Sequence, residues 1–379
     1  MSFLQFFELI LSLSLQVTLL VWITSVVSKQ SQSAELQCQL WTICNLLMLC
    51  LTVAGLNLPH LRLLHPWGHV PAGLIVHFSA ALSRAGMLTF GVWIAGVVVS
   101  LMTLMWGTYS TNRFVAKCPP VHGPLQELAA ELALSGVHDE LGRCGPVSLL
   151  YSPEIATPFC WQFHRPHIVL PEFMLDSSEE DIRMVVRHEV EHLRLGHPLQ
   201  LFVQRIVESL YWFHPAVWHV SRHVNLAREF LCDDATNSTA TETVRYLNLL
   251  IHIVEQAKRL RTVPPESITL GRPESAIGKR IRRLIARSES GNWNPTVTPH
   301  RSVASVVAAA AFVSVCWIPV NVFASPRSMW SPWPRWTADA LHDFGIHVRD
   351  YETHARGTNA YELLELDQRG SSLNQESLP

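Results

Sequence analysis

The chain contains four long runs of apolar residues, separated by more polar stretches. They cover Phe3–Val27, Cys38–Leu58, Gly86–Trp106 and Ser302–Ala324. Each is close to the ~20 apolar residues that a helix needs to cross a bilayer. The first run lacks a basic start and is too long for the apolar part of a signal peptide, so it is interpreted as a retained anchor. The pattern therefore predicts four transmembrane helices.

Between the third and fourth runs, the pattern changes to that of a mixed α+β region. Apolar residues at helical spacing predict a helix at Pro124–Leu134. Three short segments broken by prolines predict strands at Val147–Tyr151, Phe159–Phe163 and His167–Leu170. An edge strand of this small sheet would either align an extended substrate through backbone hydrogen bonds or only support the helices. Both interpretations stay open.

Two polar-faced helices are predicted after the strands. The first begins at an N-cap formed by Asp176 or Ser177 and ends near Gly196. The second runs from Pro215, a residue suited to the first turn of a helix, to Asp233. The segment between them, residues 199–212, is strongly apolar but is interrupted by Gln204, Arg205 and Glu208, so it would lie on the bilayer or pack against the spans.

Composition, charge and cysteine spacing indicate a membrane protein and give no sign of a cysteine zinc site or of nucleic-acid binding. The 379 residues are 48% hydrophobic and only 16% charged, which is typical of a membrane protein. Arg113 and Lys117 follow the third run and Arg301 precedes the fourth, which favours an outside N-terminus and a cytosolic domain at 108–300 in the plasma membrane. Eight scattered cysteines form no C-x-x-C pair. The net charge of −2 gives no indication of direct nucleic-acid binding.

The first of the two helices carries the strongest chemical signal, the H-E-x-x-H segment His188–His192. Histidines four residues apart leave the same helix face, one turn apart, and can grip one Zn²⁺ with two imidazole nitrogens. Glu189 lies beside them as a candidate general base. An exposed helix that carries two histidines by chance is the alternative.

The second helix offers the rest of a catalytic zinc site. Rotation of about 100° per residue places Arg222, Glu229 and Asp233 on one stripe. Glu229 would complete a His₂Glu site with an open position for water. Asp233 would hold a zinc-bound histidine, and Arg222 would face the oxyanion of a tetrahedral intermediate. His219 and His223 also lie four apart but have no suitably placed carboxylate.

These segments resemble those of the gluzincin metalloproteases, and in particular the BlaR/MecR-type antirepressors, the integral-membrane sensor proteases of the β-lactam response. The similarity covers roughly residues 1–325. The matching segments are Arg165–Pro171, Arg187–His192, Phe213–Trp218 and Glu229–Asp233. Three positions depart from the family pattern and concern the shape of the substrate groove. His214 replaces a common Asn, His197 replaces a common acidic residue, and the region around Gln162 lacks an expected glycine.

The resemblance implies a mainly α fold, with four transmembrane helices plus a cytosolic α+β gluzincin domain that contains a small sheet. Residues 1–107 would hold three spans, 108–300 the zinc metallopeptidase domain, 301–325 the fourth span and 326–379 an extracytoplasmic tail. The β-lactam receptors carry a penicillin-binding module with a Ser-x-x-Lys motif after the fourth span. The tail is too short for that module and lacks the motif, so β-lactam sensing is not expected.

The function implied is a zinc-dependent endopeptidase that cuts a cytosolic regulatory protein, such as a winged-helix transcriptional repressor, or itself. Two rivals remain, a quality-control protease for membrane proteins and a non-catalytic, zinc-stabilised signalling scaffold. A basic helix at Ala276–Arg287 is predicted next to the membrane, where anionic lipid would attract it. A solvated run of charges is the alternative for this helix.

Overall fold

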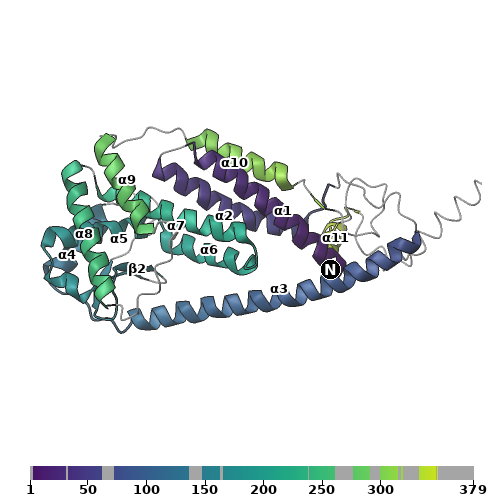
Figure 1. The fold of residues 1–379 in the computed structure, drawn as a ribbon. Coiled ribbons are helices and arrows are strands. Elements are labelled where there is room, and N and C mark those ends of the chain that lie inside the picture. Colours follow the sequence, from purple (N-terminus) through teal and green to yellow (C-terminus); the bar gives the residue numbers. More distant parts are fainter. Residues whose placement is uncertain are drawn as a thin grey trace, which may run out of the picture.

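The computed structural model describes residues 3–30, 33–61, 72–135, 147–162, 165–237, 239–260, 276–290, 299–314, 317–318, 333–346 and 348. Within these residues the protein is mostly helical, with one small mixed sheet at the end opposite the N-terminus (Figure 1). The predicted tail lies mostly outside the described residues.

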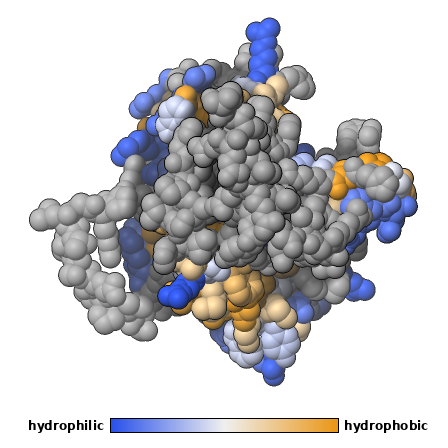
Figure 2. All heavy atoms as spheres, turned by 90° about the vertical axis from the view of Figure 1, so that its right-hand side faces the viewer, coloured by the Kyte–Doolittle hydropathy of each residue, from blue (hydrophilic) through white to orange (hydrophobic). Residues whose placement is uncertain are grey.

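Three helices are long and apolar enough to cross a membrane: α1 (Phe3–Ser28), α2 (Ala34–Asn57) and most of α3 (Ala72–Val115). Apolar side chains of α3 are exposed, and they gather along the lower edge of Figure 2, where α3 lies in Figure 1. The predicted fourth run forms α10 (Pro299–Ser314), which packs against α1 and α2 but is shorter than a span. Most of that run beyond Ser314 lies outside the described residues, so the fourth span stays a prediction.

The sheet has the order β1-β3-β2, with β1 (Ser148–Ser152) parallel and β2 (Phe159–Gln162) antiparallel to the central β3 (Pro166–Pro171). The three predicted strands are confirmed, and the predicted helix before them is α4 (Pro124–Ser135). The outer edge of β1 pairs with residues 119–121 through backbone hydrogen bonds. Among the described residues, β2 is therefore the outer strand of the sheet that pairs with no further strand.

The helix with the H-E-x-x-H segment, α5 (Glu179–Arg194), follows a short 3₁₀ helix, η1 (Glu172–Asp176). The predicted N-cap at Asp176 or Ser177 is wrong by one or two residues. Asp176 is the last residue of η1, so the cap moves to Ser178, whose Oγ accepts a hydrogen bond from the Asp181 N–H. Helix α5 packs against α4, β2 and β3, and its apolar face completes the core of this half.

Helices α6 (His197–Leu210) and α7 (Pro215–Thr236) form a hairpin that packs against the apolar helices α1, α2 and α3. One buried cluster joins Leu13, Val17 and Met48 of the spans with Val207 and Val220 of the hairpin. At the tip, Trp212 lies so close to Gly96 of α3 that a Cβ there would lie 2.2 Å from the indole ring. The apolar segment before Trp212 thus packs against the spans. The remaining described helices are α8 (Ala240–Leu260), α9 (Ala276–Ser290) and α11 (Arg335–Asp343).

Candidate metal centre

Helix α5 and helix α7 bring three potential metal ligands together. The Nε2 atoms of His188 and His192 lie 3.2 Å apart. Glu229 reaches both rings, with its carboxylate oxygens 3.6 Å from His188 Nε2 and 3.5 Å from His192 Nε2. The two histidines come from one face of α5, and Glu229 comes from the facing side of α7. The structure therefore assembles the two imidazoles and the carboxylate that the sequence predicts as ligands.

These separations fit one zinc ion. Tetrahedral ligands at about 2.0–2.1 Å from Zn²⁺ are about 3.3–3.4 Å from one another, close to the three distances found here. The nitrogens and the carboxylate are the donors that catalytic zinc sites use, and three protein ligands leave a fourth position open. Both the separations and the chemical types of the three donor groups therefore fit a zinc ion.

His188 is held from behind by α8 and α7. Its Nδ1 lies 3.1 Å from the Tyr246 hydroxyl, which donates to Asp233 Oδ1 at 2.9 Å. Because the hydroxyl hydrogen of Tyr246 is given to Asp233, the hydroxyl oxygen accepts from His188 Nδ1–H. His188 Nε2 then keeps a free lone pair. Asp233 itself lies 3.5 Å from His188 Nδ1 and is almost completely buried. Tyr246 thus lies between the histidine and the aspartate, a partner that the sequence analysis did not identify.

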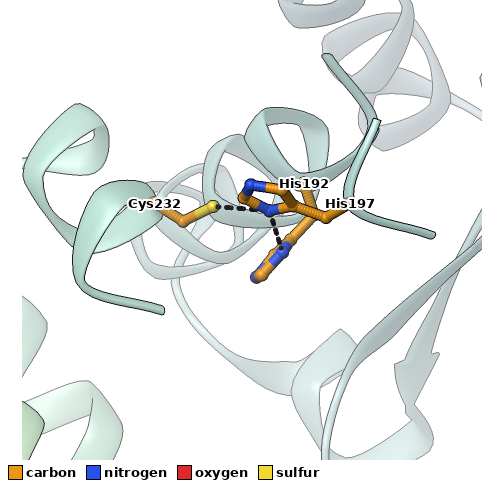
Figure 3. Close-up of side chains that lie close together, drawn as sticks. All are labelled: His192, His197 and Cys232. Carbon is orange, nitrogen blue, oxygen red and sulfur yellow. Dashed lines mark hydrogen bonds between the residues drawn. The ribbon is translucent and has the colours of Figure 1, made fainter. Parts of the chain in front are cut away.

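His192 is held by a second imidazole. Figure 3 shows His192 and His197 pointing toward each other, with Cys232 of α7 directed at His197. The two Nδ1 atoms are 2.8 Å apart, and Cys232 Sγ lies 3.7 Å from His197 Nδ1. These three side chains also lie close enough together to hold a metal. However, 2.8 Å is a hydrogen-bond distance, shorter than the separation of two zinc ligands, so we assign His197 as the partner of His192.

The protonation of these rings suits that assignment. Burial, together with the neighbouring His188, lowers the pKa of His192 to about 4. Burial and the charge of nearby groups lower the pKa of His197 to about 3. Both rings are therefore neutral at pH 7. In the tautomer of His192 whose Nε2 can bind a metal, its Nδ1–H donates to His197 Nδ1.

Replacing His197 with alanine is expected to weaken zinc binding by about 10- to 100-fold, the usual effect of losing a residue that orients a ligand. The His197→Asn variant should keep most of the affinity, because its amide oxygen can replace Nδ1 as acceptor. Zinc affinity measured by chelator competition on the purified chain checks this. The exposed His252 of α8 supplies the control, His252→Ala. Equal affinities for His197→Ala and the wild type would remove His197 from the site.

Arg280 of α9 is the main functional candidate that the sequence analysis missed. Its guanidinium lies 2.6 Å from Glu229 Oε2 and donates to both oxygens of Asp233 at 2.6 and 2.9 Å. Burial would lower the pKa of Arg280, but the charges of Asp233 and Glu229 raise it well above its usual value. One permanent cation therefore holds both the ligand carboxylate and the aspartate behind His188.

The rest of α9 also differs from the expected lipid-binding helix. Arg283 donates to both oxygens of Asp234 at 2.5 and 2.7 Å, and Arg287 donates to Asp234 at 2.5 Å. Three arginines of α9 thus face the carboxylates of α7. Their spacing of i, i+3 and i+7 puts them on one helix face. This face packs against α7 because the carboxylates at the end of α7 attract it.

Replacing Arg280 with glutamine is expected to lower the free energy of unfolding of the zinc-free protein by about 3 kcal/mol, because a buried carboxylate would lose its cation. Zinc should then raise the Tm of this variant more than that of the wild type, since the metal charge compensates the same carboxylates. Arg282→Gln, an exposed position on the same helix, is the matched control. Equal zinc-induced Tm shifts in both variants would contradict this coupling.

Glu189 lies next to the metal ligands and is 7% exposed. Burial is the main reason that its pKa is raised, and the nearby charge of Glu229 raises it further. Its side chain also hydrogen-bonds the thiol of Cys160 on β2. A carboxyl whose pKa is moved toward neutrality is suited to accept a proton and return it. The edge strand β2 lies on the same side of α5 as this carboxyl.

The structure does not place Arg222 with the ligands. The side chain is exposed on α7, two turns before Glu229, and within the described part of the chain no hydrogen bond or ion pair links Arg222 to His188, His192 or Glu229. Arg280 is the cation that adjoins them. The rings of His219 and His223 instead lie near Trp41 of α2, with ring centroids 6.0 and 4.9 Å from the indole.

Comparison with known proteins covers this same region. The sequence profile of the family described as BlaR1 peptidase M56 matches residues 77–284, more than half of the chain. The chain is also similar to "Regulatory protein BlaR1" of Bacillus licheniformis, at 28% identity over 153 residues. That segment is 40% of this chain and 24% of the relative, so the chain spans about a quarter of the length of that protein. The range matched by the family contains His188, His192, Glu229 and Arg280.

Proposed function

Because this chain belongs to the BlaR1 peptidase M56 family, we propose that it is an integral-membrane zinc endopeptidase of the antirepressor type. It would hydrolyse a cytosolic regulatory protein, itself, or both, in transmembrane signalling. The observation that carries the proposal is the convergence of His188, His192 and Glu229 at 3.2–3.6 Å, with the buried Glu189 beside them.

The residues of the chain take distinct parts in hydrolysis. A zinc ion bound by His188, His192 and Glu229 would supply Lewis acidity, which lowers the pKa of water and polarises a carbonyl. Glu189 accepts the proton of the attacking water and passes it to the leaving amine. Tyr246, Asp233 and His197 hold the two imidazoles in the tautomers that expose Nε2. The oxyanion role predicted for Arg222 stays a prediction.

The position of β2 at the edge of the sheet supports a role in substrate alignment. An extended peptide that adds to β2 as a further strand would run beside Glu189, because Cys160 of β2 contacts that carboxyl. Backbone hydrogen bonds give such a strand affinity without a fixed sequence. Of the two roles left open by the sequence, this arrangement favours substrate alignment over support alone.

The partner we propose is a cytosolic protein, with a winged-helix transcriptional repressor as first candidate. The name of the bacillus relative describes a regulatory protein, and a signalling protease needs a regulator as substrate. The orientation with the α+β region in the cytosol comes from the bias of Lys and Arg beside the spans. No direct contact with nucleic acid is proposed.

Mass spectrometry of newly formed protein N-termini tests this function. Cells that express the wild-type chain should contain cleavage products, from a regulator or from the chain itself, that cells expressing Glu189→Gln lack. Products dominated by damaged membrane proteins would favour the quality-control rival. Identical N-termini in the two cell lines, with the signalling output unchanged, would favour the non-catalytic scaffold.

A further inference from the structure

Helix α7 runs alongside α2 in the opposite direction, in a defined register. The Tyr211 hydroxyl, just before α7, lies 2.5 Å from Thr52 Oγ1 near the end of α2. Further along, the rings of His219 and His223 lie 6.0 and 4.9 Å from the ring of Trp41, about two turns from the start of α2. The steps from Tyr211 to His223 and from Thr52 back to Trp41 are of nearly equal length. The two helices are therefore antiparallel neighbours over most of a span.

This register sets the depth of the metal centre. From His223 to Glu229 the helix rises about 9 Å, which brings Glu229 level with the first turn of α2. Helix α1 leads to the same level. His214 Nε2 lies 3.1 Å from the Ser14 carbonyl, so these two residues are at the same level. Glu229 lies about 22 Å beyond His214 along α7, and Ser28 lies about 21 Å beyond Ser14 along α1. Glu229 is therefore level with the end of α1.

The ends of α1 and α2 mark one surface of the bilayer. Helix α2 has 24 residues and is therefore about 36 Å long, whereas the hydrocarbon core is about 30 Å thick. A residue level with the first turn of α2 thus lies at the edge of the hydrocarbon, on the side of the connection between α1 and α2. The tip of the α6–α7 hairpin lies close to the opposite edge.

The outer face of α6 has the character of a lipid-facing surface. Leu199 is 67% exposed and Phe202 42% exposed, and this face begins two residues after His197, the partner of His192. Such apolar side chains are unfavourable in water but stable against acyl chains. Polar groups on the inner side pair within the hairpin: Gln204 donates to Glu208 at 2.9 Å, and Arg228 donates to Gln204 at 2.8 Å. The half-exposed Arg205 donates to the same Glu208 at 2.6 Å. Internal pairing is what ionisable groups require at membrane depth.

We propose that the α6–α7 hairpin is embedded in the bilayer beside α1, α2 and α3, and that the metal centre lies at the membrane surface. The enzyme then cuts peptide segments that adjoin a membrane span. The choice of substrate rests on the proposed function, whereas the depth of the hairpin does not. A segment next to a span, including one of this chain itself, is held at the level of the site at high effective concentration. A soluble repressor would reach the same site only through an extended segment that leaves its folded body clear of the bilayer.

Depth is measured first, on the full chain in lipid nanodiscs. A spin label is placed at Leu199→Cys, Asn225→Cys or Glu154→Cys, where Glu154 is an exposed residue. In each variant Cys50, Cys144, Cys160 and Cys316 are replaced by serine, and the other four native cysteines are buried. The label at 225, about 6 Å deeper than Glu229, should be accessible to oxygen and shielded from a water-soluble nickel complex. The label at 199, level with Glu229 at the edge of the hydrocarbon, should be intermediate. The label at 154, in the turn between β1 and β2, should be open to nickel. Equal nickel access at all three positions would overturn the proposal.

Substrate preference is measured with two reporters in the same vesicles. Each has one apolar span and the same mixed peptide library, joined by a short or a long Gly/Ser spacer. The wild-type chain should cut the near library about tenfold faster, as expected from the fall of effective concentration with linker length. Equal cleavage of both, absent in Glu189→Gln, would overturn the inference but keep the peptidase. No cleavage of either would count against both the surface substrate and the peptidase, whereas the depth result would stand.

Discussion

Replacing Glu189 with glutamine is expected to abolish proteolysis while the chain still binds zinc. The amide keeps the size and most of the packing of the carboxyl but cannot accept a proton at neutral pH. Loss of a general acid–base group costs about 10²–10⁴ in rate, so cleavage by purified membranes should fall to the background. Bound zinc, measured by elemental analysis, should stay near one ion per chain.

Glu191→Gln is the matched control for this experiment. Glu191 lies on the same helix two residues further on. Its side chain is 15% exposed, and within the described part of the chain it pairs with Arg194 at 2.6 Å. Its replacement should change neither zinc content nor cleavage rate. Full proteolysis by Glu189→Gln would rule out Glu189 as the base, and an unchanged signalling output without proteolysis would favour the scaffold.

Replacing Glu229 with alanine is expected to abolish both zinc binding and proteolysis, unlike Glu189→Gln, which keeps the zinc. Burial would raise the pKa of the Glu229 carboxyl, but the hydrogen bond with His188 and the charge of Arg280 outweigh burial and hold the pKa well below its usual range. The carboxylate is thus ionised at pH 7 and ready to bind a metal. Its removal should weaken zinc binding by more than the about 10- to 100-fold typical of supporting residues.

Chelator competition on the purified chain measures this loss, and Asn225→Ala, one turn earlier on the exposed side of α7, serves as the control. Thermal unfolding of both variants without zinc separates lost coordination from lost folding. If Glu229→Ala bound zinc as tightly as the wild type, the metal would have to lie in the His192, His197 and Cys232 group, and the peptidase proposal would fail.

The ligands could be predicted because each signal lies within one helix. His188 and His192 are four residues apart, so helical geometry alone brings their rings together. Helical rotation placed Glu229 on one stripe of a second helix, which made it a candidate ligand. Only the packing of α7 on α5 brings its carboxylate to the histidines. The strands and α4 were likewise readable from short-range patterns of apolar residues, since local periodicity decides which face is buried.

The role of Arg280 could not be predicted from the sequence, because Arg280 lies among other basic residues. Four basic residues within five positions of α9 are typical of a helix beside anionic lipid, and nothing local tells which arginine turns inward. The acidic end of α7, about fifty residues earlier, makes that choice. Tyr246 and His197 were missed for a related reason, because a hydrogen bond to the back of an imidazole leaves no spacing motif in the chain.

The amino-acid sequence by itself determined the apolar helices, the order of the helices and strands, and the candidate metal ligands, because apolar runs and residue spacing are properties of each segment alone. Only the tertiary structure decided which cation adjoins the candidate ligands and which level of α2 these ligands reach. Both depend on α7 packing between α2, α5 and α9, and such packing joins residues whose separation along the chain carries no periodic signal.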